Sequence, residues 1–196
     1  MSGEGVQLYD REGRRKYLTG DERQAFLRAA EKAPRQVRTL CLVLAFTGCR
    51  ISEALELCQR RIDLDESSIV FESLKKRRKG VYRAVPVPPH VIDALDLVHG
   101  VREAQKGRDG GQARLWPFSR TSAWRYVAEV LERAGVEGPQ ASPKGLRHGF
   151  GVQAVSSGVP LNMVQKWLGH AQLSTTAIYA DAVGAEEKSI MHRMWV

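Results

Sequence analysis

The feature that most constrains this chain is the spacing of its apolar residues, which is mostly that of α-helices. Val37, Leu40, Cys41 and Leu44 recur at i, i+3, i+4 and i+7, and Gly48 follows them. Such a stripe predicts a helix that is buried along one face and ends at the glycine, which accepts left-handed backbone angles at little steric cost. The sequence therefore predicts a fold built mainly from helices.

Other segments carry helix signals of the same kind. Thr19 followed by Glu22 is a capping-box pair, which opens a helix that ends before Pro34. Residues 174–176 are candidate caps for the segment that bears Tyr179. Ser52 is a candidate cap for a short helix that runs to Leu57. Further helices are expected from Pro88 to about Val98, from Trp124 to Gly135, around Arg147 and His148, from Pro160 to Gly169, and from about Ala185 to Trp195.

One part of the chain has the pattern of a β-hairpin. Ser68 to Ser73 and Tyr82 to Val87 are predicted strands, and residues 74–81 join them. The connection contains the run Lys75-Lys76-Arg77-Arg78-Lys79, so the hairpin has a strongly basic tip. Gly100 to Gln112, which is rich in glycine and charge, is predicted to be a flexible loop. The predicted fold class is α+β, mainly α-helical, with a small antiparallel β-sheet or hairpin.

The chain has the length of one domain with a short extension. Residues 1–17 are rich in Gly, Arg and Glu without an apolar period, and they predict a flexible N-terminal arm or linker. Residues 18–196 are expected to form a single domain, because a chain of 196 residues with 43% apolar residues can bury a real core.

Composition narrows the class of partner. The formal net charge is +8 and the pI is about 9.7, which favours a polyanionic partner, although charge alone does not choose between DNA, RNA and an anionic membrane. The longest apolar run, Leu40 to Phe46, is too short to span a bilayer, and the N-terminus lacks an apolar signal core. Cys41, Cys49 and Cys58 show no metal-ligand spacing, so buried thiols are expected. We expect a cytoplasmic protein without a bound metal.

Three short motifs and a late tyrosine carry the chemistry. They are Thr47-Gly48-Cys49-Arg50-Ile51-Ser52-Glu53, Lys144-Gly145-Leu146-Arg147-His148, Leu168-Gly169-His170, and Tyr179 nine residues later. In this order, and with the basic hairpin between the first and the second, the chain resembles the catalytic domain of the tyrosine recombinases, also called phage integrases. The resemblance runs from about Leu18 to about Trp195 and implies the fold of that domain.

The resemblance implies the roles of the strongest candidates. Two guanidinium groups, from Arg50 and Arg147, would bind the non-bridging oxygens of a DNA phosphate with planar hydrogen bonds that strengthen toward the transition state. Tyr179 would attack the phosphorus and form a 3′-phosphotyrosine linkage, with a free 5′-hydroxyl leaving. The bond energy stays in that linkage, so no ATP, metal or other cofactor is implied. The phenol has an ordinary pKa of about 10 and needs an acceptor for its proton.

Other proton-carrying residues are less sharply defined. The family supplies a general acid from the hairpin, where Lys75, Lys76 and Lys79 are candidates and Lys75 matches best, while Lys76, Arg77, Arg78 and Lys79 are expected to contact DNA. Lys144 stands where the family more often has histidine, and a lysine is a poor general base near neutral pH. This leaves the base open between Lys144, His148 and His170. The resemblance makes His170 mainly a phosphate ligand and His148 partly structural.

The resemblance also implies partners. Glu53 would support the active site by orienting Arg50 or a neighbouring histidine. Double-stranded DNA is the expected substrate, held by a homo-oligomer, a tetramer in the family. Relatives carry a helical DNA-binding domain before the catalytic one, and here only about 17 residues precede it. A fragment, a minimal enzyme and a subunit that takes DNA affinity from a partner protein all fit. The apolar residues Ile190, Met191, Met194 and Trp195 would pack on their own domain or on a neighbouring subunit.

Three functions are compatible with these residues. The leading one is a prokaryotic site-specific recombinase that integrates, excises or resolves a mobile element or plasmid. A type IB topoisomerase-like enzyme shares the chemistry but needs one active site and no second duplex. A non-catalytic DNA-binding regulator would keep the fold and the basic surface, and retention of Arg50, Arg147, His170 and Tyr179 argues against it.

Overall fold

The computed structural model describes residues 7–72, 80–180, 191, 192, 194 and 195. In chain order the elements are α1 (Gly20–Glu31), α2 (Arg35–Thr47), α3 (Ile51–Leu55), the 3₁₀ turn η1 (Gln59–Arg61), β1 (Ile62–Asp63), β2 (Ser68–Glu72), β3 (Tyr82–Pro86), α4 (Pro89–His99), α5 (Val101–Lys106), α6 (Arg120–Arg133), α7 (Pro143–Ser156), α8 (Leu161–Leu168) and α9 (Ser174–Ala177). The predicted class, mainly α-helical with a small antiparallel sheet, is confirmed.

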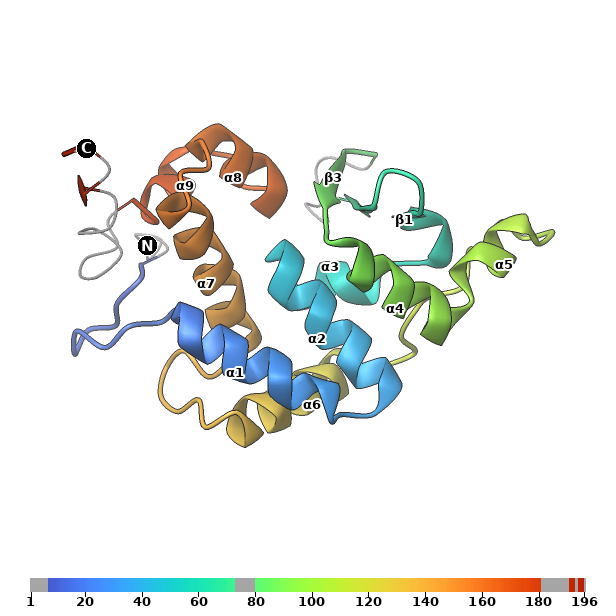
Figure 1. The fold of residues 1–196 in the computed structure, drawn as a ribbon, viewed down its shortest axis with the longest axis horizontal. Coiled ribbons are helices and arrows are strands. Elements are labelled where there is room, and N and C mark those ends of the chain that lie inside the picture. The colour runs from blue at the N-terminus through green and yellow to red at the C-terminus, as the bar shows by residue number, and fades with distance from the viewer. Residues whose placement is uncertain (1–6, 73–79, 181–190, 193, 196) are drawn as a thin grey trace, which may run out of the picture.

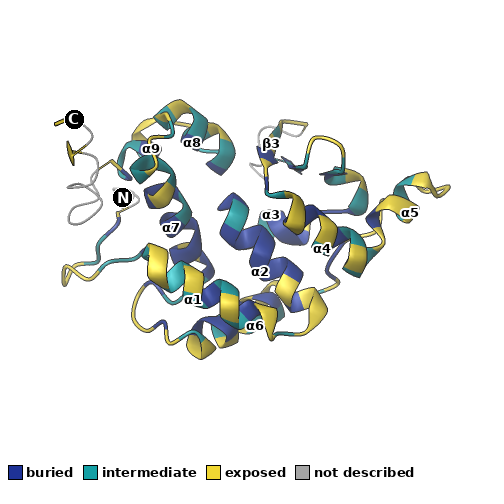
Figure 2. Ribbon diagram, viewed as in Figure 1, coloured by how far each residue is buried: buried dark blue, intermediate teal, exposed yellow. Residues whose placement is uncertain are grey.

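Helix α2 lies in the middle of the molecule, with α1 and α6 on one side, α7 on another and α4 on a third (Figure 1). Its predicted stripe is buried, and so are residues between the stripe positions, such as Leu42 and Val43. A helix that is apolar nearly all round must be covered nearly all round. Figure 2 accordingly shows α2 mostly in the colour of buried residues, whereas α1 and α6 expose one face each.

The ends of the first two helices follow their predicted signals. Thr19 caps α1, with its hydroxyl accepting from the Glu22 N–H at 3.3 Å while the Glu22 carboxylate accepts from the Thr19 N–H at 2.9 Å. Gly48 ends α2 with a left-handed φ of 60°. A Cβ at Gly48 would also lie 2.6 Å from the Phe150 ring, so the position excludes side chains for two reasons.

The sheet is antiparallel, with strand order β1-β2-β3 among the described residues. Strands β2 and β3 form the predicted hairpin, in which Ile69 pairs with Val85 and Phe71 with Arg83. Residues 73–79, which contain the whole basic run from Lys75 to Lys79, lie outside the described residues. The sheet packs on α3 through β2 and on α8 through β3.

Some boundaries differ from the predictions. Arg50, not Ser52, is the N-cap of α3, because the Glu53 carboxylate accepts from the Arg50 N–H at 2.8 Å. Strand β1 was not predicted, and part of the predicted loop after Gly100 is helix α5. Leu173 precedes α9 without a side-chain cap bond, so the cap predicted at residues 174–176 is wrong.

Residues 7–17 differ most from the predicted flexible arm. They turn back on themselves through a bridge between Tyr9 and Arg15, and Leu8 and Tyr17 are buried. These side chains join a second apolar cluster with residues of α7, α8 and Tyr179. Arg15 then pairs with Glu22 at the start of α1. The turn is therefore packed against the helices that carry the second and third motifs.

The three cysteines are free and buried, as expected. Burial raises the pKa of both Cys41 and Cys49 to about 12, so these thiols stay protonated and unreactive. In the part of the chain that the structure describes, no helix combines the length and apolar content needed to cross a membrane.

Candidate active site

Arg50 reaches the site from the start of α3, directly after the turn at Gly48. Its guanidinium is partly exposed, and its Nη1 donates to the Glu53 carboxylate at 3.1 Å. Glu53 is 3% exposed and also accepts from the Arg50 backbone. The carboxylate therefore fixes Arg50 at two points, while the Arg50 side chain remains 44% exposed.

Arg147 on α7 is buried and donates hydrogen bonds to the ends of two other helices, α2 and α8. Its Nη1 donates to the Gly48 carbonyl at the end of α2, and its Nη2 donates to the Leu168 carbonyl at the end of α8, both at 2.8 Å. Burial, and then the charge of Arg50, lower the pKa of Arg147 to about 10. The group stays cationic at neutral pH.

Tyr179 lies just beyond α9 and is 1% exposed. Its ring packs closely on α7, where a Cβ at Gly151 would lie 2.6 Å from the tyrosine Cζ. The ring also stacks on His170, with centroids 6.2 Å apart and planes 13° from parallel. Burial raises the pKa of Tyr179, and the nearby charges of Arg147 and Arg50 oppose part of that rise.

The two motif histidines hold different positions around Tyr179. His148 is 2% exposed, and its Nδ1 lies 3.2 Å from the Tyr179 hydroxyl. His170 is half-buried, and its Nδ1 lies 2.9 Å from the Thr176 hydroxyl. Burial and neighbouring cations lower the pKa of His148 to about 4 and that of His170 to about 3. Both imidazoles are therefore neutral at neutral pH.

Glu53 has a second partner that the sequence analysis missed. Arg83 on β3 donates through Nη2 to the Glu53 carboxylate at 2.8 Å and through Nε to the Trp167 carbonyl on α8 at 2.8 Å. Burial raises the pKa of Glu53, but the hydrogen bonds and charges of Arg83 and Arg50 outweigh it and hold that pKa below its ordinary value. The sequence around Arg83 gave no local signal of this role.

A pocket of about 310 Å³ brings the predicted residues together. It is lined by Arg50, Lys144, Arg147, His148, His170 and Tyr179, and also by Arg120, Ile51, Ser52, Pro143 and Thr175. Glu53 lies behind Arg50 and is not part of the lining. Lys75 is the one predicted catalytic residue that falls outside the described part of the chain, and Lys76, Arg77, Arg78 and Lys79 do so as well.

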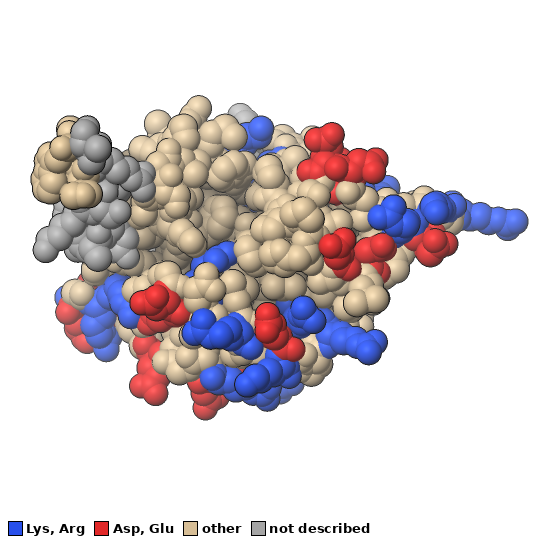
Figure 3. Space-filling view, viewed as in Figure 1, with Lys and Arg blue, Asp and Glu red and all other residues tan. Residues whose placement is uncertain are grey.

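The charge of this pocket suits an anion. Four of its side chains are cationic, namely Arg50, Arg120, Lys144 and Arg147, and none of its described lining residues is a carboxylate. Arg120, at the start of α6, was not predicted, since one arginine among many carries no local signal. The outer surface in Figure 3 has no such single sign of charge, because Lys and Arg are mixed with Asp and Glu along its lower edge.

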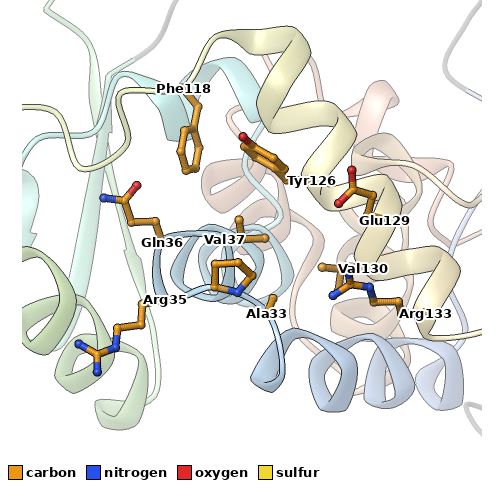
Figure 4. A pocket seen from close by; sticks show the side chains of 10 residues that line it. Ala33, Arg35, Gln36, Val37, Phe118, Tyr126, Glu129, Val130 and Arg133 are labelled. Atoms are coloured by element: carbon orange, nitrogen blue, oxygen red, sulfur yellow. The ribbon is translucent and has the colours of Figure 1, made fainter.

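A second pocket, of about 500 Å³, lies between the start of α2 and α6 (Figure 4). Phe118 and Tyr126 line it with their rings 5.1 Å apart, together with Val37 and Val130. It contains none of the motif residues. It is larger than the cationic pocket, but the motif residues line the smaller one.

Known proteins share this sequence pattern and this fold. The model of the phage integrase family matches residues 16–185. The tyrosine recombinase XerD of Mycobacterium tuberculosis is 39% identical over 150 residues, which cover 72% of this chain and 46% of XerD. The chain thus spans about half the length of these curated relatives, the XerD proteins of Mycobacterium tuberculosis and Mycobacterium leprae.

Solved structures agree with this assignment. The crystal structure of XerA recombinase matches with a TM-score of 0.76 and 25% identity, over 91% of this chain and 64% of that one. The structure of XerH site-specific recombinase bound to its difH substrate, a pre-cleavage complex, matches with a TM-score of 0.72 and 21% identity, over 96% and 60%. With its motifs gathered in one pocket and its fold shared with these proteins, the chain belongs to the phage integrase family, the tyrosine recombinases.

Proposed function

We propose that this chain is a site-specific DNA recombinase that cleaves and rejoins DNA through a phosphotyrosine. The observation that carries the proposal is that Tyr179 lines the same pocket as the guanidinium groups of Arg50 and Arg147, although the three residues are far apart in the sequence. A cationic pocket with a phenol in its wall can hold a phosphodiester next to a nucleophile.

The cleavage step follows from these positions. The Tyr179 oxygen forms a bond to phosphorus as the bond from phosphorus to the 5′-oxygen breaks, which leaves a 3′-phosphotyrosine and a free 5′-hydroxyl. Arg50 and Arg147 donate to the non-bridging oxygens, whose negative charge grows during attack. His170 and Lys144 add hydrogen-bond donors at the pocket wall, and Glu53 keeps Arg50 in place.

The leaving oxygen takes a proton from the basic hairpin. Lys75 is the proposed general acid, while Lys76, Arg77, Arg78 and Lys79 contact the DNA backbone and contribute salt-dependent affinity. Because the phosphotyrosine keeps the energy of the broken bond, attack by a 5′-hydroxyl of another strand reseals the DNA with exchanged partners.

Double-stranded DNA is the proposed substrate and a tetramer the proposed assembly. The structure of the Tn1549 transposon integrase supports the substrate, because it is a protein of this fold in complex with circular intermediate DNA. Met194 and Trp195 near the C-terminus are 75% and 68% exposed, which suits a contact with a second copy. A partner protein that also binds DNA would add to the grip on the duplex.

The test uses a pool of nicked duplexes with a randomised core and a 5′ label on the cut strand. The nick lets the short 5′-hydroxyl fragment diffuse away, so a cleaved strand stays attached to the protein. We expect a covalent band that survives denaturation and is absent with Tyr179→Phe. A band that persists in that variant would mean that another residue is the nucleophile, and no band with the wild type would reject the proposed activity.

Duplexes with the sequence recovered from the band then distinguish a recombinase from a type IB topoisomerase-like enzyme. A recombinase exchanges strands between two labelled duplexes that carry the recovered sequence. A type IB topoisomerase-like enzyme relaxes supercoiled DNA and gives no exchanged product.

A further inference from the structure

The Tyr179 phenol needs a proton acceptor, and three nearby side chains are candidates. Lys144 is exposed on the first turn of α7 and is cationic, so it has no lone pair to offer at neutral pH. The His170 ring is nearly parallel to the Tyr179 ring, with centroids 6.2 Å apart, and its Nδ1 contacts the Thr176 hydroxyl. Neither side chain has a polar contact with the phenol oxygen among the described residues.

His148 is placed differently. Its Nδ1 lies 3.2 Å from the Tyr179 hydroxyl, and its ring is tilted by 55° to the tyrosine ring. Gly151, three residues further along the same face of α7, has no side chain and so allows the tyrosine ring to approach the helix. The contact is thus built into the packing of α7 against the segment that carries the nucleophile.

The base role requires one particular tautomer of His148. His148 Nε2 is buried and has no hydrogen-bond partner in the described part of the structure. If Nδ1 accepts from the phenol, Nε2 carries the ring proton, and that N–H points into the protein interior. A buried donor without a partner costs roughly 1 to 3 kcal/mol of stability, so packing alone does not favour a histidine at position 148.

We propose that His148 is the general base of the cleavage reaction and that its Nδ1 takes the phenol proton as Tyr179 attacks phosphorus. This inference rests on the proposed function. The proton moves from the Tyr179 oxygen to Nδ1 while the bond from that oxygen to phosphorus forms and the bond to the 5′-oxygen breaks. On resealing, the resulting imidazolium returns the proton to the departing phenol.

The groups around His148 keep its imidazole neutral before the reaction. Lys16 from the N-terminal turn and Lys144 and Arg147 from α7 are cationic, and the neighbouring His170 and Tyr179 are neutral. Burial, and then the charges of Lys144, Arg147 and Lys16, hold the pKa of His148 at about 4, so the imidazole is neutral at neutral pH and one of its ring nitrogens has a free lone pair. The negative charge of the bound phosphate then favours the imidazolium that forms during attack.

The decisive variant is His148→Asn, tested on the nicked duplex recovered with the wild type. The asparagine Oδ1 can accept the phenol hydrogen bond from about the Nδ1 position but cannot take the proton. We expect cleavage to slow by roughly 10² to 10³-fold while DNA affinity is unchanged. The cleavage rate of this variant should rise about tenfold per pH unit, because the fraction of Tyr179 present as phenolate rises tenfold per pH unit below the tyrosine pKa. The wild-type rate should be nearly flat from about pH 6 to 8.

A matched control is His99→Gln. His99 is another partly buried histidine, whose Nε2 lies 2.9 Å from the Thr39 hydroxyl, and it lies away from the pocket. Its replacement should leave cleavage within about twofold of wild type. Equal cleavage rates and pH profiles for His148→Asn and the wild type would overturn the inference while leaving the proposed function intact. Absence of any wild-type adduct would instead reject the proposed function.

A substrate with sulfur in place of the 5′-bridging oxygen distinguishes a general-acid role of His148 from a general-base role. A thiolate leaves without a proton, so this substrate relieves the loss of a general acid but not that of a general base. The His148→Asn variant should stay slow on it. Recovery to the wild-type rate would assign His148 to the leaving group and overturn the proposal.

A measurement on the wild type covers the case in which the variant does not fold. Nitrogen-15 spectra of the histidine rings distinguish a protonated from an unprotonated ring nitrogen. We expect His148 to have an unprotonated Nδ1 and a protonated Nε2 at neutral pH. A proton on Nδ1 would make His148 a donor to the phenol and would contradict the base role.

Discussion

Arg83 on strand β3 and Glu53 on helix α3 form an ion pair at 2.8 Å in which the two side chains are 8% and 3% exposed. Arg83 also donates to the Trp167 carbonyl at the end of α8, and Glu53 holds Arg50. The hairpin, the first arginine motif and the Leu-Gly-His motif therefore meet at one buried pair. Gly169 allows this approach, since a Cβ there would lie 2.9 Å from Arg83 Nη1.

Removing Arg83 should destabilise the fold strongly. Arg83→Met leaves the Glu53 carboxylate buried with less compensation, and the expected decrease in the free energy of unfolding is about 3 to 5 kcal/mol. Urea denaturation measures it. Arg102→Met, which breaks the exposed pair with Asp96, should change the same quantity by less than about 1 kcal/mol. A decrease of similar size in both variants would mean that burial does not set the strength of the Arg83 pair.

Gly151→Ala should impair cleavage more than binding. The added methyl would meet the tyrosine ring at 2.6 Å, so the ring must move and the phenol must leave its place beside His148. We expect covalent adduct formation to slow by at least about tenfold, with DNA affinity unchanged. Gly20→Ala is the control, because Gly20 lies at the start of α1 with nothing near its Cβ position. An unchanged cleavage rate for Gly151→Ala would show that the ring position does not limit the reaction.

Stability should fall as the pH drops below about 6.5. The pKa of His148 is about 4 in the folded protein and is close to 6.5 when the chain is unfolded, so the unfolded state binds more protons between those values. The stability is thus fully present above the unfolded pKa and is lost as the pH falls through the folded one. His148 alone adds a slope of up to about 1.4 kcal/mol per pH unit. Urea denaturation from pH 4 to 7 should show a smaller slope in His148→Asn than in the wild type.

Arg120 should contribute to DNA binding through charge. It lines the cationic pocket from the start of α6, where its guanidinium can bind one DNA phosphate. Arg120→Ala removes that cation, so the slope of log affinity against log salt should fall by about one. Arg133→Ala at the other end of α6, which lines the second pocket, is the matched control and should leave the slope unchanged. Equal slopes for both variants would exclude Arg120 from DNA binding.

Deleting residues 188–196 should weaken self-association on DNA if the exposed C-terminal side chains contact a second copy. Met194 and Trp195 carry most of the exposed apolar surface of the described part of this segment. Size-exclusion chromatography with the recovered duplex measures the assembly, and circular dichroism checks that the fold is intact. An assembly of unchanged size would indicate that the segment packs on its own domain.

Local sequence signals determined the helices and the hairpin. The Val37 to Leu44 stripe, the Thr19 and Glu22 cap and the glycines at 48 and 169 act over one or two turns, so their effect can be predicted from neighbours in the sequence. The motifs likewise predicted which side chains share one active site. Ser52 was wrongly predicted as a cap because α3 already begins at Ile51, after Arg50, whose N–H is satisfied by the Glu53 carboxylate.

Only the tertiary structure decided how these residues work together. The contact of His148 with the Tyr179 oxygen, the Arg83 and Glu53 pair, and the packing of residues 7–17 all join segments far apart in the sequence. Such contacts depend on the angle at which helices cross and on where a missing side chain permits close approach, as at Gly151 and Gly169. Local propensity carries no information on either, which is why the sequence leaves the general base open between Lys144, His148 and His170.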